Sequence, residues 1–519
     1  MSTQSINANW MSDQIIYEIF PDRFAIGHPH SSTTKLALPL YDATRHHQGK
    51  VQDYVTRSWD QMPIIPSLGK DFFGGDLDGI VDHLDYLKTL GITALFLTPI
   101  FFAPSNHKYD TTDFFQVEQQ FGGKKSLQRL IAELQNRNMR LIMDVAFNHM
   151  SDIHSWFQKA KNNISPFKDF FSFESDGKYR SWRNHWEMPE LNLSNLSLQN
   201  LLFRDSDSVL QMYLDLGIDG WRFDSAADLG SDIVHQICQL IRNKFPKAVL
   251  IGETTHFGAN WIGEEMFHGV MNYYFRSALL GWISGTLSTN QFKVASNDYY
   301  QSYGMPGALC SWNMLSSHDT PRLKHILRRG WQRYLAVVAQ FTFPGVPIVY
   351  YGEEIGMEGG EDPDCRRPMI WDKSRWDKDS ENFFRQMISI RKSRRELRNG
   401  KFLLLETKPS DNTIAFLRFT EAPHEVALIV LNNSSTPMKE RLMVPHSHLY
   451  DGLWMENLLL PNTPYVTFSQ GYIDLALPAQ TAAIYCPNDT QYSHYNFYKQ
   501  RNTGSMPFPV ELVINSDVR

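Results

Sequence analysis

Short segments of the sequence place acidic, basic and histidine side chains next to apolar runs. In GWRFD, Arg222 and Asp224 are two residues apart, so an extended strand points both side chains to one side. A neighbouring arginine lowers the pKa of an aspartic acid and keeps it ionised, which is the state in which a carboxylate acts as a nucleophile. A buried structural ion pair explains the same spacing, and this pair alone does not separate the two interpretations.

A second carboxylic acid ends an apolar segment. Glu253 follows Leu250 and Ile251 in LIGETTH. A hydrocarbon environment raises the pKa of a carboxyl group, which makes a general acid available near neutral pH. A partly exposed loop glutamate is the alternative interpretation.

Two further segments carry polar side chains after apolar runs. In SSHDTPR, Asp319 is a third acid or, with Thr320, the cap of a helix that has Pro321 in its first turn. LIMDVAFNHM holds Asp144 within the apolar run and His149 just beyond it. A single histidine in such a place is commonly a hydrogen-bonded core residue, so this segment alone indicates no chemistry.

These segments belong to a repeated alternation between about residues 14 and 398. β-Branched or aromatic runs, breaks at Gly, Asn, Asp or Pro, and apolar patterns of helical period follow one another. Strands are predicted to begin at Gln14, Thr93, Arg140, Asp219, Ala248, Phe267, Ala308 and Val346. Helices are predicted between them throughout, for example from Asp78 to Gly91. This pattern predicts an α/β fold, a closed (β/α)8 TIM barrel.

The polar segments fall at the C-terminal ends of the third, fourth, fifth and seventh predicted strands. Barrel enzymes have their active sites on this face. Two carboxylic acids with opposed pKa tuning and a third acid are the groups needed to cleave a glycosidic bond through a covalent sugar intermediate. No Walker loop, GxGxxG at a strand end, HExxH or GxSxG suggests a competing chemistry.

Other parts of the chain depart from the alternation. Residues 24–75 and 150–200 have little periodicity, and long loops at strand ends are where barrel enzymes build their sites. Short alternating strands near the end, KFLLLE, TIAFLRF, EVALIVLNN and TAAIYC, predict an antiparallel β-sandwich. The predicted domains are a barrel at 1–149 and 201–398, an inserted domain B at 150–200, a C-terminal β-sandwich at 399–487 and an unassigned tail at 488–519.

The composition excludes several classes of function. Lys and Arg number 50 against 56 Asp and Glu, for a net charge of −6 without long blocks of like charge, so neither nucleic acid nor a membrane is an expected partner. The 4 cysteines form no CxxC pair, which argues against a disulfide framework and a thiolate zinc site. The first residues lack a basic segment followed by an apolar stretch. We therefore expect a soluble cytoplasmic protein without a cofactor.

The motifs DVAFNH, GWRFDSAAD, GETTH and SSHD resemble, in order and spacing, the conserved regions of the α-amylase family of glycoside hydrolases. The start IIYEIFPDRF, the motif MPELN and the run GGEDPDCRRPMIWD are similar to the branch of neopullulanases, cyclomaltodextrinases and maltogenic amylases. The resemblance spans about residues 10–487.

The resemblance implies roles for individual residues. Asp224 matches the nucleophile, Glu253 the general acid/base, and Asp319 the acid that hydrogen-bonds the sugar ring hydroxyls in the transition state. The residues expected to bind the substrate are His107, Tyr109, which stacks on the sugar, His149, Arg222 and His318, together with Asp362 and Arg366, which hold the sugar further from the cut.

The sequence also departs from that branch. It has no room before Trp10 for the branch's usual N-terminal β-sandwich. The run HPHSS follows PDRFAIG, where the branch often has Asp and Asn ligands for calcium, so we expect no metal site there. Thr255 stands in place of a usual Trp, and Glu190 in place of a common Lys; both changes fall on the leaving-group side.

We expect a retaining hydrolase that cuts α-1,4-glucosidic bonds of maltooligosaccharides through a covalent glucosyl-Asp224 intermediate, with cyclodextrins and pullulan as further candidate substrates. One alternative is a transglucosylase or sugar isomerase that uses the same intermediate. Another is a non-catalytic carbohydrate-binding or partner protein. The expected partner is an α-glucan oligosaccharide, and the sequence does not indicate an oligomeric state.

Overall fold

The computed structural model describes residues 10–41, 54–66, 69–174, 177–407, 412–422, 424–446, 449 and 451–487. The chain divides into two compact units, Met1–Phe402 and Leu403–Arg519, so the division lies a few residues after the predicted start of the sandwich at 399. The unassigned tail at 488–519 lies outside the described residues.

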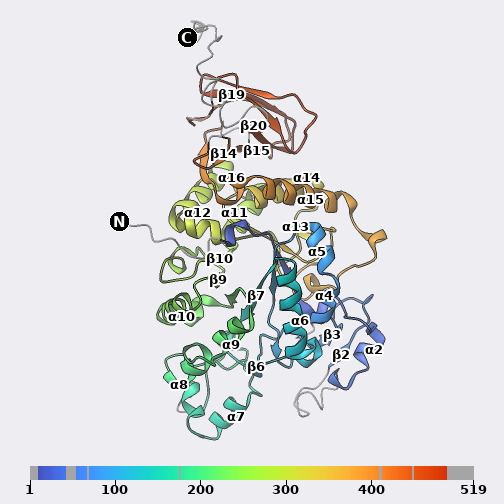
Figure 1. Ribbon diagram of the computed structural model, residues 1–519, viewed down its shortest axis with the longest axis vertical. Helices are drawn as coiled ribbons and strands as arrows, with labels where there is room; N and C mark the ends of the chain where they lie inside the picture. The colour runs from blue at the N-terminus through green and yellow to red at the C-terminus, as the bar shows by residue number, and fades with distance from the viewer. Residues whose placement is uncertain are drawn as a thin grey trace. The chain divides into compact units, whose positions relative to one another are not determined.

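The first unit contains a closed barrel of eight parallel strands, as predicted (Figure 1). In chain order these strands are β1 (Ile16–Ile19), β4 (Ala94–Leu97), β7 (Arg140–Val145), β8 (Gly220–Phe223), β9 (Val249–Thr254), β10 (Gly269–Asn272), β11 (Trp312–Met314) and β12 (Val346–Tyr350). Strand β1 pairs with β4 on one side and with β12 on the other, which closes the ring. Apolar side chains such as Phe96, Trp312 and Ile348 fill the interior, so the barrel is a packed core rather than a pore.

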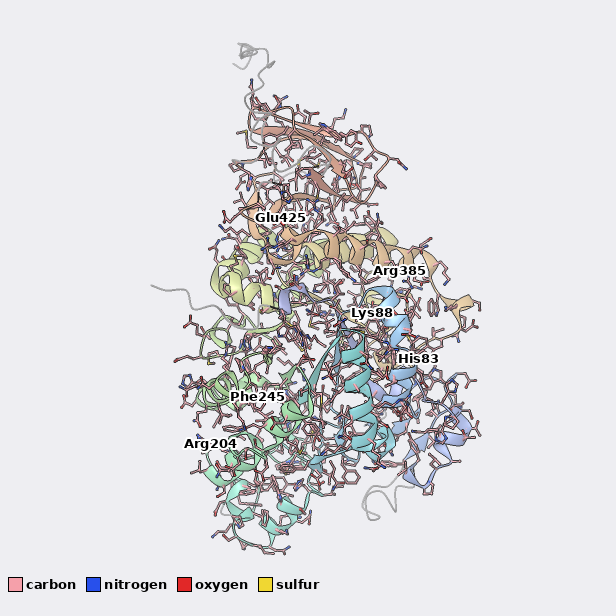
Figure 2. The ribbon with its side chains drawn as sticks, viewed as in Figure 1. His83, Lys88, Arg204, Phe245, Arg385 and Glu425 are labelled. Atoms are coloured by element: carbon pink, nitrogen blue, oxygen red, sulfur yellow. The ribbon has the colours of Figure 1, made fainter. Side chains whose placement is uncertain are left out.

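Helices lie around the barrel strands and in the loops between them (Figure 1). They are α1 (Pro21–Phe24), α2 (Ser32–Leu36), α4 (Leu77–Asp82), α5 (Leu84–Leu90), α6 (Gly123–Asn136), α9 (Val209–Leu216), α10 (Ser231–Lys244), α11 (Tyr273–Ser284), α12 (Thr289–Cys310), α13 (Leu323–Ile326), α14 (Gly330–Thr342), α15 (Lys378–Ser393) and α16 (Arg395–Asn399). Arg385 of α15, labelled in Figure 2, donates from Nη1 to the carbonyl of Thr89 in α5 at 2.9 Å. This contact joins α15 to α5, which are far apart in the sequence. No helix in the described ranges is long and apolar enough to cross a membrane.

The helix predicted from Asp78 to Gly91 is interrupted. His83, labelled in Figure 2, ends α4 and precedes α5 with φ −110° and ψ 8°. Its Nδ1 lies 2.8 Å from the carbonyl of Gly79, and its ring packs on Trp371 with centroids 3.7 Å apart. These contacts favour the break, which periodicity alone does not reveal. Gly91 ends α5 as predicted, with a left-handed φ of 105°.

The predicted alternation of strand and helix is wrong between β9 and β10. This link contains a 3-10 turn at Ala259–Trp261 and no α-helix. Gly258 and Gly263 divide the link into short pieces, and glycine disfavours helix interiors. The helices of this side of the barrel follow β10 instead.

The two aperiodic segments form small structures beside the barrel. Strand β2 (Val55–Thr56) pairs with β3 (Asp71–Phe72) in the first of them. The segment between β7 and β8 contains α7 (Ser155–Lys161) and α8 (Leu196–Gln199) and is held by isolated bridges, one of which joins His149 to Glu190. Strand β5 (Phe101–Phe102) pairs with β6 (Asp113–Val117) in the loop after β4.

The second unit is an antiparallel sheet in the order β13-β14-β15-β20-β17-β18-β19-β16. Its strands are β13 (Lys401–Leu405), β14 (Thr413–Phe419), β15 (Val426–Asn432), β16 (Met438–Met443), β17 (Trp454–Asn457), β18 (Val466–Ser469), β19 (Tyr472–Leu477) and β20 (Thr481–Pro487). The four strands that we predicted by sequence are β13, β14, β15 and β20, whereas β16 to β19 were missed. In β16 a charged residue, Glu440, is buried at the alternate position between Met438 and Leu442, which weakens the apolar signal. Both halves of the sheet contribute to one apolar core.

Candidate active site

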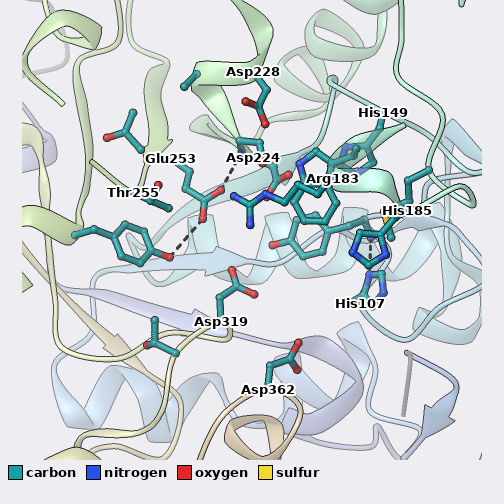
Figure 3. A pocket seen from close by; sticks show the side chains of 18 of the residues that line it. His107, His149, Arg183, His185, Asp224, Asp228, Glu253, Thr255, Asp319 and Asp362 are labelled. Carbon is teal, nitrogen blue, oxygen red and sulfur yellow. Dashed lines mark hydrogen bonds between the residues drawn. The ribbon is translucent and has the colours of Figure 1, made fainter. Parts of the chain in front are cut away.

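A cavity of about 530 Å³ lies at the C-terminal ends of the barrel strands (Figure 3). The predicted residues that line it are His107, Tyr109, His149, Asp224, Glu253, Asp319, Asp362 and Arg366. Arg222 and His318 are fully buried behind this lining and contact its carboxylates. The structure therefore brings all the predicted site residues together, although they come from segments far apart in the sequence.

Arg222 of β8 joins three carboxylates. Its Nη1 lies 2.8 Å from Asp144 Oδ2 and 3.0 Å from Asp224 Oδ1, and its Nη2 lies 2.8 Å from Glu253 Oε1. Burial lowers the pKa of Arg222, but the surrounding carboxylates more than offset this and raise it, so the guanidinium stays charged. One arginine thus holds Asp224 and Glu253 facing the same cavity.

The backbone after β8 also fixes Glu253. Ser225 has left-handed dihedrals, φ 44° and ψ 46°, which are costly for a residue with a Cβ. This conformation aims the Ser225 N–H at Glu253 Oε2, at 2.9 Å, and Tyr273 Oη lies 3.4 Å from Oε1 (Figure 3). The side chain of Glu253 is held at both oxygens and only 9 % of the residue is exposed, so it is not the partly exposed loop glutamate of the alternative interpretation.

The pKa of Asp224 is raised, so the expectation that Arg222 lowers it is wrong as a net effect. Burial and the negative charge of Glu253 raise the pKa of Asp224, and Arg222 opposes them. Because a buried site and a neighbouring carboxylate both disfavour the charged form, Asp224 keeps its proton to a higher pH than an isolated aspartic acid would.

Asp319, which follows β11, is surrounded by positively charged groups, in contrast to Asp224. Arg366 Nη2 lies 2.9 Å from its Oδ1 and His318 Nε2 lies 3.0 Å from its Oδ2. Burial raises the pKa of Asp319, but the charges of His318 and Arg366 outweigh burial and lower it below its usual range. The helix-cap interpretation is wrong, because α13 begins at Leu323 and has no side-chain cap.

Tyr109 connects the aromatic side of the cavity to the charged cluster. Its hydroxyl donates to Asp144 Oδ2 at 2.8 Å and lies 2.6 Å from His318 Nε2. The ring of His107 stacks near that of Tyr109, with centroids 5.8 Å apart. Lys108 lies between them with a left-handed φ of 65°, and its buried ammonium forms an ion pair with Glu118 at 2.7 Å.

His149 is buried without the hydrogen bonds of an ordinary core histidine. It is 1 % exposed, and neither ring nitrogen meets hydrogen-bond geometry with a described residue. Burial lowers the pKa of His149 to about 4, so the ring is neutral at neutral pH. A neutral ring that borders a cavity with both nitrogens unused is well suited to meet sugar hydroxyls.

Several residues that line the cavity were not predicted from the sequence. Trp182, Arg183 and His185 come from the segment between β7 and β8, and Figure 3 shows Arg183 pointing into the cavity. Nothing in that aperiodic segment indicated which of its side chains reach the barrel. Asp228 and Tyr273 also line the cavity. Tyr273 directly follows β10, so the rule that side chains at the C-terminal ends of strands form the site could have identified it.

The three positions at which the sequence departs from the neopullulanase branch differ in their distance from the cavity. Thr255 lines the cavity. Glu190 forms the bridge with His149 and is not among the lining residues. Near HPHSS, Lys35 Nζ lies 2.5 Å from Asp76 Oδ2. Within the described ranges, no group of three or more His, Cys, Asp or Glu side chains is arranged to hold a metal ion.

Comparison with known proteins identifies the family. Residues 18–400 match the alpha-amylase catalytic domain. The chain is 33 % identical over 450 residues to neopullulanase 2 of Thermoactinomyces vulgaris, which covers 84 % of this chain and 72 % of that protein. It is 34 % identical over 436 residues to a cyclomaltodextrinase of a Bacillus species, covering 82 % of this chain and 73 % of the relative.

A solved structure agrees with these matches. The cyclic alpha-maltosyl-(1→6)-maltose hydrolase of Arthrobacter globiformis superimposes with a TM-score of 0.76 at 25 % identity, over 92 % of this chain and 98 % of that one. The fold, the residues at the barrel face and the relatives agree, and the chain belongs to the α-amylase family as a glycoside hydrolase of the cyclomaltodextrinase and neopullulanase type.

Proposed function

We propose that this enzyme hydrolyses α-1,4-glucosidic bonds of maltooligosaccharides with retention of configuration. Asp224 is the nucleophile, Glu253 the general acid/base, and Asp319 the carboxylate that holds the sugar hydroxyls. Cyclodextrins and pullulan are the further candidate substrates, because the relatives are named for cyclic or pullulan-type glucans.

The observation that carries this proposal is the bridge that Arg222 makes between Asp224 and Glu253. Both carboxyl groups contact one guanidinium, through Nη1 at 3.0 Å and Nη2 at 2.8 Å. Retaining glycosidases need their two carboxyl groups close together, because one of them attacks the sugar directly, whereas inverting enzymes leave room for a water molecule. Two carboxyl groups on a single guanidinium support the close arrangement.

The proposed reaction has two displacements. An oxygen of Asp224 attacks the anomeric carbon, the glycosidic C–O bond breaks, and the proton of Glu253 moves to the leaving oxygen. Water then gives a proton to the Glu253 carboxylate and attacks the same carbon, which releases Asp224 and an α-configured product. Asp319 stays ionised beside His318 and Arg366, so its oxygens can accept hydrogen bonds from sugar hydroxyls throughout.

The remaining residues would bind the sugars on either side of the cut. His107, Tyr109 and His149 form the aromatic wall of the cavity, and Asp362 pairs with Arg366 at 2.9 Å further along. Thr255 and Tyr273 lie on the same side of the site as Glu253 and would meet the leaving sugar. Transfer to a sugar acceptor uses the same intermediate and differs only in whether water or a hydroxyl attacks it.

Product analysis tests the proposal. Maltotriose, cyclodextrins, pullulan and starch are incubated separately with the purified enzyme, and early products are followed by NMR and chromatography. We expect the α anomer as the first reducing product and the fastest cleavage with linear or cyclic α-1,4 glucans. An initial β anomer would exclude the double displacement, and cleavage of none of these substrates would exclude the substrate class.

A further inference from the structure

We propose that Glu18, an acidic residue of β1 with no direct part in the reaction scheme above, is a positioning residue that keeps His318 doubly protonated and thereby holds Asp319 in its working orientation. The inference rests on the proposed function only for the role of Asp319. The protonation of His318 follows from the contacts themselves.

Glu18 contacts His318 from behind the cavity. Its Oε1 accepts the backbone N–H of His318 at 2.9 Å and lies 2.6 Å from the ring Nδ1. Both side chains are fully buried. A carboxylate that binds both the backbone and the ring of one residue fixes the side-chain rotamer as well as the position of the chain.

Counting donors and acceptors places a proton on each ring nitrogen. Nδ1 faces a carboxylate oxygen of Glu18, which accepts. Nε2 faces Asp319 Oδ2 at 3.0 Å and the oxygen of Tyr109 at 2.6 Å. The Tyr109 hydroxyl already donates its own proton to Asp144, so its oxygen accepts from His318. Every partner of both ring nitrogens therefore accepts, and only the imidazolium form satisfies them all.

The charged groups around His318 come from several elements. Glu18 on β1, Asp144 on β7 and Asp319 supply negative charge, while Arg222 on β8 and Arg366 after β12 supply positive charge. Arg366 Nε donates to the carbonyl of His318 at 2.7 Å. Burial lowers the pKa of His318, but Asp319 and then Glu18 more than offset this and raise it to about 10.

The expected effect of removing the Glu18 charge follows from this arrangement. In Glu18→Gln, the amide oxygen still accepts from Nδ1–H, so deprotonation removes the hydrogen from Nε2. A bare Nε2 presents a lone pair to the Asp319 carboxylate and to the Tyr109 oxygen, and these contacts become repulsive. Because Asp319 acts most strongly in the transition state, the loss should appear in kcat more than in KM.

The direct test is a titration of His318 in the full-length enzyme by NMR of ¹⁵N-labelled imidazole rings, with the His318 signals assigned by their absence in His318→Gln. In the wild type we expect His318 to carry both protons up to about pH 9. In Glu18→Gln we expect the midpoint to fall by about one pH unit or more. Glu354→Gln is the matched control, because Glu354 is also buried near the barrel but contacts Tyr17 and Tyr86 instead.

Kinetics provides the second readout. The ratio of kcat in Glu18→Gln to kcat in the wild type should fall about tenfold or more as the pH rises through the lowered midpoint, while the Glu354→Gln ratio stays level. A neutral His318 at pH 7 in the wild type overturns the proposal without any variant, and so does a Glu18→Gln titration identical to that of the wild type. Failure of the reaction scheme leaves the His318 titration unaffected, so the two failures are distinguishable.

Discussion

The ammonium of Lys35 lies 2.5 Å from Asp76 Oδ2, directly beside the HPHSS run. Both side chains are buried, and Asp76 Oδ1 accepts the backbone N–H groups of Gly27 and Gly79 at 3.0 and 2.7 Å. The charge of the carboxylate is therefore balanced by a side chain of the protein itself. A calcium ion is not needed to compensate it.

Metal removal is accordingly expected to have no effect. Activity and Tm should be the same with and without EDTA, whereas Lys35→Met should lower the free energy of unfolding by about 3–5 kcal/mol, because it leaves Asp76 buried and uncompensated. An activity assay and thermal unfolding with and without EDTA measure the first effect, and chemical denaturation of the variant measures the second. The double variant Lys35→Met/Asp76→Asn should recover part of the loss. A drop in Tm with EDTA that calcium restores would contradict the prediction.

Removal of either reacting carboxyl group should abolish turnover. Asp224→Asn loses the nucleophilic charge, and Glu253→Gln loses the transferable proton, while each amide keeps the shape of the side chain. We expect kcat to fall by about three orders of magnitude or more in each variant, with the far-UV circular dichroism and Tm close to wild type. Asp232→Asn, an exposed change in the first turn of α10, is the control. A tenth of wild-type activity in either variant would exclude the assignment.

The effect of the Glu253 charge on the pKa of Asp224 should be visible in the pH dependence of activity. The raised pKa of Asp224 means that activity is lost, as the pH falls, at a higher pH than for an ordinary aspartate. In Glu253→Gln the repulsive charge is gone, so the pKa of Asp224 should fall and the acid limb should move to lower pH. An α-glucosyl fluoride, whose leaving group needs no proton, reports this limb through the rate of fluoride release. An unmoved acid limb would mean that Glu253 does not act on Asp224.

Much of the barrel could be predicted from local sequence. The strands VPIVYYG and RLIMDVAF are β-branched, apolar and bounded by breaks, so their type follows from neighbouring residues alone. The interruption at His83 could not be predicted, because it depends on Trp371, which lies far along the chain. Strand β16 was missed because Glu440 is buried where an apolar residue was expected.

Some residues of the site could likewise be predicted from the sequence, and others could not. Asp224, Glu253 and Asp319 could be predicted, since each ends or follows a barrel strand and matches a motif. Trp182 and Arg183 could not, because they belong to a segment without period whose path depends on isolated bridges such as Ser181–Pro189. The contact between Glu18 and His318 joins the first barrel strand to the loop after the seventh, and only the closure of the barrel brings these residues together.

Lys108 is expected to support the cavity wall through its buried ion pair. Its ammonium also donates to the carbonyl of Ala103 at 2.9 Å and holds the backbone between His107 and Tyr109 in a left-handed conformation. Lys108→Met leaves Glu118 buried and uncompensated, so the free energy of unfolding should fall by about 3–5 kcal/mol. Arg129→Met, which removes an exposed partner of Asp78, should cost no more than about 1 kcal/mol. Equal losses in urea denaturation would refute this difference.

The leaving-group side of the cavity decides how much sugar transfer accompanies hydrolysis. Thr255 is exposed and lines the cavity, so an indole at this position would border the cavity. An aromatic contact with a sugar typically adds about 0.5–1.5 kcal/mol of binding free energy. This corresponds to at most about a tenfold increase in affinity for a sugar acceptor. We therefore expect the wild type mainly to hydrolyse maltotriose and Thr255→Trp to raise the ratio of transfer to hydrolysis by up to about tenfold.

Thr255→Val is the matched control for that experiment, because it keeps the size of the side chain and adds no ring. Its product ratio should stay at the wild-type value. The ring of Tyr273 already lies on this side, with its hydroxyl 3.4 Å from Glu253 Oε1, and a sugar acceptor can stack there too. If the wild type transfers mainly to sugars, or if the indole leaves the product ratio unchanged, Tyr273 rather than position 255 provides the acceptor surface. Tyr273→Ala should then shift products toward hydrolysis, measured by chromatography of maltotriose digests at high and low sugar concentration.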